Sequence, residues 1–214
     1  MKRLVTLLLA AGLVLGAATA QAADFKISGL WQHRVSFADR NFEKHNGDDK
    51  MRAASRMRTQ IDVIASESLK GVVFFEIGHQ NWGSVNEGAS LGTDGKVVKV
   101  RYSYVDWAIP NTDATVRMGL QKYTLPNFTG IGSPILDADG AGISIHNQFT
   151  DNIGTNLFWL RAANDNDPDK ATHDAHDAMD FIGLTVPMTF DGVKVTPWGM
   201  GGIIGQDSFK NGNF

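Results

Sequence analysis

Apolar and polar residues alternate along most of the chain with a period of two. Between residues 25 and 37, the odd positions include Phe25, Ile27, Trp31, Val35 and Phe37, whereas the even positions are mostly polar. Such alternation predicts a β-strand with one apolar and one polar face. The same pattern predicts eight further strands, over residues 51–65, 72–80, 97–109, 114–121, 141–149, 154–163, 178–189 and 193–204.

The connections between these segments alternate in length. Long connections cover residues 38–50, 81–96, 122–140 and 164–177, and short ones cover 66–71, 110–113, 150–153 and 190–192. Short turns on one side of a membrane and long loops on the other are typical of outer-membrane β-barrels. The pattern therefore favours an all-β, transmembrane antiparallel β-barrel over a soluble β-sandwich. No mature stretch of about 20 apolar residues is present, so no transmembrane helix is predicted.

The first 22 residues have the composition of a secretory signal peptide. Lys2 and Arg3 form its basic start, residues 4–18 its apolar core, and residues 20–22 a small-residue cleavage site. We expect cleavage before Ala23, with residues 23–214 forming one β-barrel domain. A retained anchor is the alternative, but the apolar core is shorter than the about 20 residues that span a bilayer.

Composition and motifs narrow the class of protein further. Removing the two basic residues of the signal moves the formal charge from −3 to −5, which argues against a nucleic-acid partner. The chain has no cysteine, so no disulfide framework is expected. No nucleophile elbow, P-loop or dinucleotide fingerprint is present, so we expect neither an enzyme nor a bound cofactor.

Basic residues recur on the polar faces of the predicted strands. A charge on the lipid face costs about 2–4 kcal/mol at the membrane midplane, so these side chains are expected to point into a water-filled lumen. There they would bias which ions enter. The alternative is a structural role, through pairing with Glu76, Asp62 or acidic loop residues. The candidate residues are Arg34, Arg52, Arg56, Arg58, Lys99, Arg101 and Arg117.

The connection over residues 122–140 is partly apolar and carries Asp137 and Asp139. We expect it to fold into the barrel with these two carboxylates facing the basic wall, which would form a constriction with a transverse field. An ordinary external loop is the alternative. We expect no metal site: the His- and Asp-rich residues 164–177 read as a solvated loop. The calcium-loop pattern there lacks its glycine and its bidentate glutamate, which leaves weak surface binding of calcium as the alternative.

Two regions resemble a known family. The run RMRTQID at residues 56–62, followed by VVFFE at 72–76, resembles the second and third strands of general bacterial porins. The runs YVDW at 104–107 and TVRMGLQ at 115–121 resemble the strands before their constriction loop. More closely, the mature chain resembles the outer-membrane homotrimeric porins of sulfate-reducing Gram-negative bacteria. This resemblance implies a trimer of barrels with about 16 strands each, in which residues 122–140 are the inward-folded loop.

The predicted function is passive diffusion of small hydrophilic solutes and ions through a trimeric pore in outer-membrane lipid. Nine strands are an odd number, whereas bacterial single-chain barrels have an even one. We therefore expect the chain to be the N-terminal half of a longer porin and unable to close or conduct alone. A small closed barrel with a structural or adhesive role and no conducting pore is the alternative function. A soluble exported binding protein is the third.

Overall fold

The computed structural model describes residues 23–38, 50–92, 95, 98–127, 132–164 and 178–205. The predicted signal peptide and the possible calcium loop at 165–177 lie outside these residues. Within them the chain is all-β, apart from one 3-10 turn, η2 (Val85–Glu87). The strands are β1 (Asp24–Ala38), β2 (Lys50–Ser66), β3 (Leu69–Asn81), β4 (Lys99–Ala108), β5 (Ala114–Thr124), β6 (Asp137–Thr150), β7 (Ile153–Ala163), β8 (Met179–Thr185), β9 (Met188–Phe190), β10 (Val193–Val195) and β11 (Trp198–Ile204).

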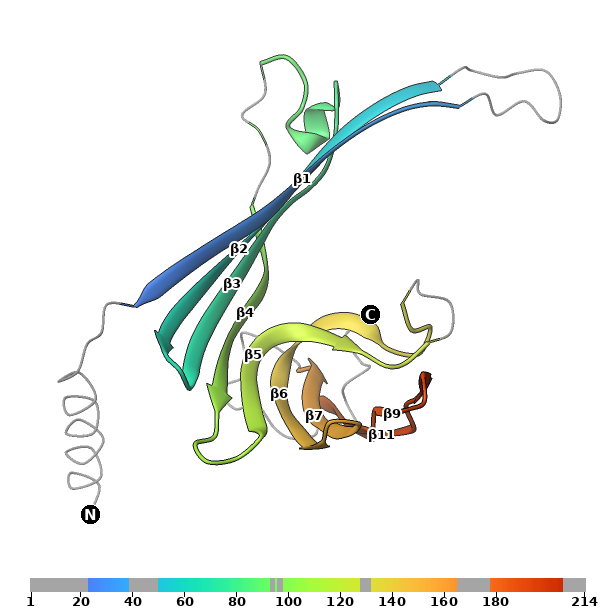
Figure 1. Cartoon of the computed structure of the whole chain (residues 1–214). Coiled ribbons are helices and arrows are strands. Elements are labelled where there is room, and N and C mark those ends of the chain that lie inside the picture. The colour runs from blue at the N-terminus through green and yellow to red at the C-terminus, as the bar shows by residue number, and fades with distance from the viewer. Residues whose placement is uncertain are drawn as a thin grey trace, which may run out of the picture.

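All strands belong to one antiparallel sheet (Figure 1). Strands β1 to β8 pair in chain order and β11 pairs with β8, while β9 and β10 form a small hairpin beside this path. The sheet is open among the described residues, with β1 and β11 at its two ends. In the part of the chain that the structure describes, no helix has the length and apolar character needed to cross a membrane.

The first seven predicted strands are confirmed, with shifted ends. The last two predicted strands are each split, at Pro187 and at Pro197. Proline has no backbone N–H and cannot complete the ladder inside a sheet, which explains why eleven strands replace the predicted nine. The connection predicted at 122–140 is also shorter than expected. Strand β5 continues to Thr124 and β6 begins at Asp137.

One row of directly opposed residues crosses the sheet from β1 to β11. Opposed residues of paired strands lie on the same face of the sheet, so this row defines what we call the apolar face. Every side chain in the row is apolar, and two positions are glycine. The row consists of Phe25, Val63, Gly71, Val105, Met118, Ile143, Trp159, Ile182 and Gly201.

The opposite face, which we call the polar face, is closed by a small core from β5 onwards. Strands β5 to β8 curl around this core, whereas β1 to β4 twist gently (Figure 1). Leu125, in the connection after β5, is fully buried, and the backbone N–H of Leu125 donates to the carbonyl oxygen of Leu136 at 3.0 Å. The core comprises Tyr123, Leu125, Phe158 and Leu160, with Leu136, Phe181 and Met200 packed against it.

Two glycines permit close approach of the strands inside the curl. A Cβ on Gly142 would lie 2.0 Å from the carbonyl oxygen of Trp159 and 2.5 Å from the hydroxyl of Tyr123. Gly119 has φ 124°, a conformation that other residues rarely adopt. Because Gly119 and Gly142 are opposed across β5 and β6, the sheet can bend sharply at this point without side-chain clashes.

A β-bulge in β4 changes which of its residues face which side. Phe74 is opposite Tyr102 and Phe75 is opposite Val100, so Arg101 is an extra residue in the ladder. Simple alternation along the sequence predicts that Ser103 lies on the polar face with Lys99 and Arg101, and that Tyr102 and Tyr104 lie on the apolar face. This prediction is wrong. Beyond the bulge Ser103 shares the apolar face, and the tyrosines lie on the polar face.

Candidate functional site: the polar face of the sheet

All seven basic residues singled out in the sequence lie on the polar face. Register places them opposite other residues of that face, for example Arg56 opposite Gln32 and Lys99 opposite Glu76. Arg101, in the bulge, reaches the same face because its guanidinium contacts Glu76. The full set is Arg34, Arg52, Arg56, Arg58, Lys99, Arg101 and Arg117.

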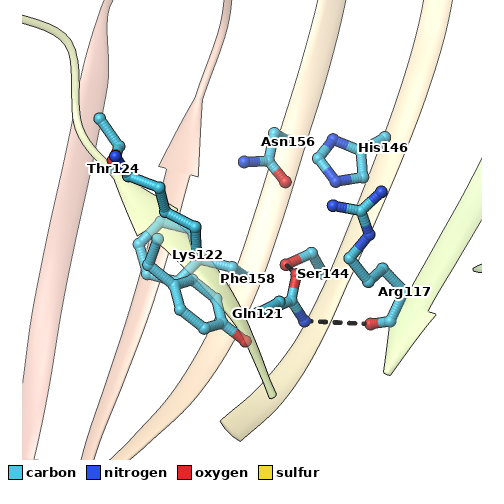
Figure 2. Close-up of a pocket in the computed structure, with 9 residues that line it drawn as sticks. Arg117, Gln121, Lys122, Thr124, Ser144, His146, Asn156 and Phe158 are labelled. Atoms are coloured by element: carbon cyan, nitrogen blue, oxygen red, sulfur yellow. Dashed lines mark hydrogen bonds between the residues drawn. The ribbon is translucent and has the colours of Figure 1, made fainter. Parts of the chain in front are cut away.

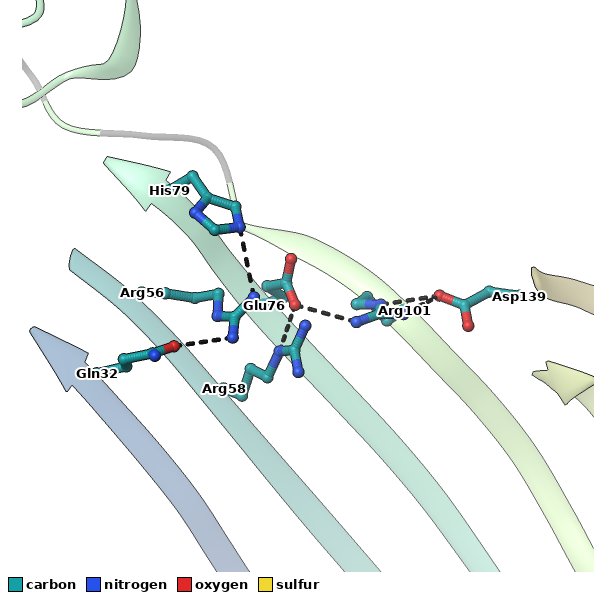
Figure 3. A network of polar contacts seen from close by, with 7 residues as sticks. All are labelled: Gln32, Arg56, Arg58, Glu76, His79, Arg101 and Asp139. Atoms are coloured by element: carbon teal, nitrogen blue, oxygen red, sulfur yellow. Dashed lines mark hydrogen bonds and ion pairs between the residues drawn. The ribbon is translucent and has the colours of Figure 1, made fainter. Parts of the chain in front are cut away.

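Four charged side chains of this face and Asp139, which begins the apolar phase of β6, form what we call the basic cluster: Arg56, Arg58, Glu76, Arg101 and Asp139 (Figure 3). Glu76 is its centre, because one carboxylate oxygen accepts from Arg58 Nε at 2.5 Å and from Arg101 Nη1 at 3.2 Å. Arg101 also donates to Asp139 Oδ2 through Nε at 2.8 Å and Nη2 at 2.5 Å. The guanidinium groups of Arg58 and Arg101 thus share two carboxylates. With Arg56 counted, the cluster has three cations and two anions and keeps one net positive charge.

Arg56 is held at the margin of this cluster by neutral partners. Its Nη2 donates to Gln32 Oε1 at 2.8 Å, and its Nη1 lies 3.4 Å from His79 Nε2. The charge of Arg56 therefore has no carboxylate partner among the ion pairs of the described residues.

The cluster also crosses a place where the sheet divides. Pairing between β4 and β5 stops at Ser103 opposite Leu120, so Arg101 has no partner strand on that side. Arg101 instead reaches past β5 to Asp139 on β6. The exposed fractions of these side chains are between 15% and 28%, so each ion pair contributes only about 0–1 kcal/mol. The pairs fix the arginine positions more than they stabilise the fold.

A second ionic group lies nearer the short turns. Arg117 forms a bidentate pair with Asp106, through Nε at 2.6 Å and Nη2 at 2.9 Å. Lys70 Nζ lies 3.5 Å from the same carboxylate, so two cations share one anion. The Arg117 guanidinium also lies 4.0 Å from the ring centroid of Tyr104. Aromatic residues therefore belong to the polar face.

The two acidic residues expected at a loop tip instead begin strand β6. Asp139 does contact the basic wall, through Arg101, whereas Asp137 pairs locally with Lys122 at 2.9 Å and Thr124 Oγ1 at 2.8 Å. The described parts of the connection, residues 125–127 and 132–136, contribute Leu125 and Leu136 to the core on the polar face. The connection is thus folded inward there, but its carboxylates are on a strand.

Sequence reasoning did not identify a pocket on the polar face of β5, β6 and β7. Its lining includes Arg117, Ser144, His146, Asn156 and Phe158, and it has a volume of about 270 Å³ (Figure 2). The only signal for it in the sequence was the polar residue at every second position between 144 and 148. This alternation shows which face these side chains share, but not that they meet side chains of other strands in a pocket. No group of three or more His, Cys, Asp or Glu residues suited to a metal ion occurs within the described ranges.

No protein-family model matches the chain, and no curated protein does. The resemblance to bacterial porins therefore stays a prediction, and the function is argued from the sheet itself.

Proposed function

We propose that this chain forms wall segments of a water-filled outer-membrane β-barrel. Through it, small hydrophilic solutes and ions would diffuse passively, with homotrimers as the working unit, as in the porins that the sequence resembles. The observation that carries the proposal is the unbroken apolar row across nine paired strands. It lies on the face opposite to the basic cluster and outside the curl of β5–β8.

The exposure of the apolar face supports contact with lipid. Phe25 is 63% exposed, Met118 43% and Ile182 46%. Soluble monomers rarely expose a contiguous apolar patch larger than a few hundred Å². This row runs the full width of the sheet, and hydrocarbon is the environment in which its exposure carries no cost.

The limits of the apolar band on β6 fit the thickness of a bilayer. The band ends at Asp139 on one side and at Asn147 on the other, eight residues later. At about 3.4 Å per residue this is roughly 27 Å along the strand, or about 21 Å of height at a tilt of about 40°. A barrel's lipid-facing band is about 25 Å tall. Ion pairs mark the first limit, with Lys122–Asp137 and Arg161–Asp180 on neighbouring strands.

The polar face supports a wet interior beside β1–β4. Its ionic groups are partly exposed, and the basic cluster has one uncompensated positive charge. Charges in this arrangement are solvated inside a pore and would favour entry of anions. A conducting pore also requires partners for the edges of β1 and β11, because unpaired strand edges are not tolerated in lipid. The proposal therefore includes pairing of both edges in the assembled state.

Single-channel recording tests this function. The full chain is refolded in detergent, its β-structure is checked by circular dichroism, and it is added to a planar lipid bilayer. Stepwise conductance that grows with salt concentration is expected from the assembled state, in which both edges of the sheet are paired. Folded protein that enters the bilayer without producing conductance steps would contradict the proposal.

One observation favours a second candidate, a closed barrel without a pore. Inside the curl of β5–β8, the cluster around Leu125 fills the polar face with packed side chains, which leaves no lumen at that point. Migration of unheated protein in detergent gels separates the two candidates. A trimer-sized species supports the pore, and a monomer-sized one supports the closed barrel.

A further inference from the structure

The pocket on β5–β7 is built from two neighbouring rows of opposed residues. In one row Arg117, Ser144 and Phe158 follow each other across the three strands. In the next row His146 is opposite Asn156. Figure 2 shows the side chains of Asn156, His146 and Arg117 gathered at one end of the pocket. Three planar polar groups from three strands thus converge at one end of a pocket that Phe158 also lines.

These groups have bonding capacity that the described residues do not use. The Oδ1 atom of Asn156 is buried and has no hydrogen-bond partner among them. A buried amide group without a partner costs about 1–3 kcal/mol. By contrast, Ser144 and Gln121 at the other end satisfy each other, because the Ser144 hydroxyl donates to Gln121 Oε1 at 2.9 Å. The unmet capacity is therefore confined to the end at Asn156.

The electrostatics of the same end favour an anion. Arg117 directs Nε and Nη2 to Asp106, so Nη1 takes no part in that bidentate pair. Lys70 shares Asp106, so the group of Arg117, Lys70 and Asp106 carries one net positive charge. A carboxylate beside the guanidinium would neutralise this charge and gain a charge-assisted hydrogen bond.

We propose that this pocket is a binding subsite for small hydroxycarboxylates. The carboxylate lies against Arg117 and His146, and the neighbouring hydroxyl bonds the amide of Asn156. A hydroxyl suits this position because it donates to an amide oxygen and accepts from an amide N–H with equal ease. Phe158 lies beneath the carbon chain. A volume of about 270 Å³ accommodates a solute of a few carbons, since one water occupies about 30 Å³.

This inference rests on the proposed function in that it names a solute class for the inner wall of the pore. Its test does not depend on conduction. Glycerate and propionate share a carboxylate and a three-carbon chain, and they differ in their hydroxyls. Their dissociation constants are measured by NMR titration of the detergent-solubilised full chain. We expect glycerate to bind about fivefold more tightly, which is the effect of one net hydrogen bond.

The variant Asn156→Ala separates hydroxyl recognition from folding. It should weaken glycerate binding about fivefold and leave propionate binding unchanged. Unchanged propionate binding therefore also shows that the variant is folded. Asn147→Ala, on the same hairpin but on the apolar face, is the matched control and should change neither constant.

Equal affinities for the two acids, or an unchanged glycerate constant in Asn156→Ala, would overturn the subsite. Planar-bilayer recording of the same preparation keeps the two proposals apart. Conductance without discrimination between the acids rejects the subsite alone. Discrimination without conductance retains the subsite and rejects the pore.

Discussion

In strands β1–β4 the polar face is open and charged, whereas in β5–β8 the same face is largely closed by packed side chains. Val72 is the only buried residue among the side chains described in β1–β4. In β5–β8 every strand contributes buried residues to this face, such as Gln121, Ser144, Phe158 and Thr185. The apolar face, by contrast, continues unchanged through both halves.

The difference lies in the residues of the polar face next to the apolar row. In the open half these positions carry long or bulky side chains, including Asp62 and Tyr104. In the closed half the same row continues as Gly119 and Gly142 in β5 and β6, and then as Leu160 and Phe181, which pack in the core. Small residues allow the strands to curl, and the connection after β5 then fills the space inside. The inner residues thus decide whether a wall segment borders an open or a filled interior.

Removing the centre of the filled interior should have the largest effect. Leu125 is fully buried, so Leu125→Ala deletes packed methyl groups and should lower the free energy of unfolding by about 2–5 kcal/mol. Urea titration in detergent micelles measures this. Hydrogen exchange should show the loss of protection in β5–β8 and not in β1–β3.

Leu69→Ala is the matched control for that comparison. Leu69 lies on the apolar face of β3 and is 39% exposed, so its truncation leaves no enclosed cavity. Equal destabilisation by the two variants would mean that the interior of the curl contributes no more than the open half.

Enlarging a glycine at the curl should have a smaller effect. In Gly142→Ala the new methyl group meets the carbonyl oxygen of Trp159 and the hydroxyl of Tyr123. The backbone must shift, at a cost of about 1–3 kcal/mol. Gly201→Ala is the control, because nothing lies within 4 Å of its Cβ position. A Gly142 variant as stable as the Gly201 variant would show that the close approach is not needed for the curl.

The sequence predicted most of the sheet, because alternation persists wherever one face is apolar and the other is polar. It did not predict the orientation of β4, because alternation cannot show that Arg101 is an extra residue in the ladder. It also ended the strand before Lys122 and Thr124. These residues lie at the limit of the apolar band, where Lys122 and Thr124 are polar on the apolar face while Tyr123 packs in the core on the other face, so the alternation changes phase.

The sequence predicted which face of the sheet carries the candidate site, but not which side chains of that face contact each other. The basic positions follow from alternation, but their partners depend on which strands are neighbours and in which register. Glu76 and Arg101 are 25 residues apart, and Arg101 and Asp139 are 38 apart. The pocket at His146 and Asn156 depends in addition on the curl, which arises from glycines whose role no periodic pattern reveals.

Removing positive charges from the polar face of β1–β4 should change the ion selectivity of the pore rather than the stability of the fold. The combined variant Arg52→Gln, Arg56→Gln and Arg58→Gln removes three positive charges from the polar face. Reversal potentials in a salt gradient should shift toward cations, by roughly fivefold in the permeability ratio. Arg161→Gln removes a cation from the apolar face instead and should leave the potential unchanged. An unchanged potential in the triple variant would reject the placement of these arginines in a lumen.

Removing the central carboxylate should shift selectivity the other way, with the smallest effect. Glu76→Gln leaves Arg58 and Arg101 without their shared carboxylate, so the net charge of the basic cluster rises by one. One unit charge is worth about 1 kcal/mol at 4 Å in water and less across a screened pore. The preference for anions should therefore rise roughly twofold. Glu67→Gln, in the exposed turn between β2 and β3, changes the total charge of the chain by the same amount and should leave the reversal potential unchanged. If both glutamate variants shift the potential equally, selectivity reflects the total charge of the chain. A shift confined to Glu76→Gln instead assigns it to the cluster, and so to the open half of the sheet.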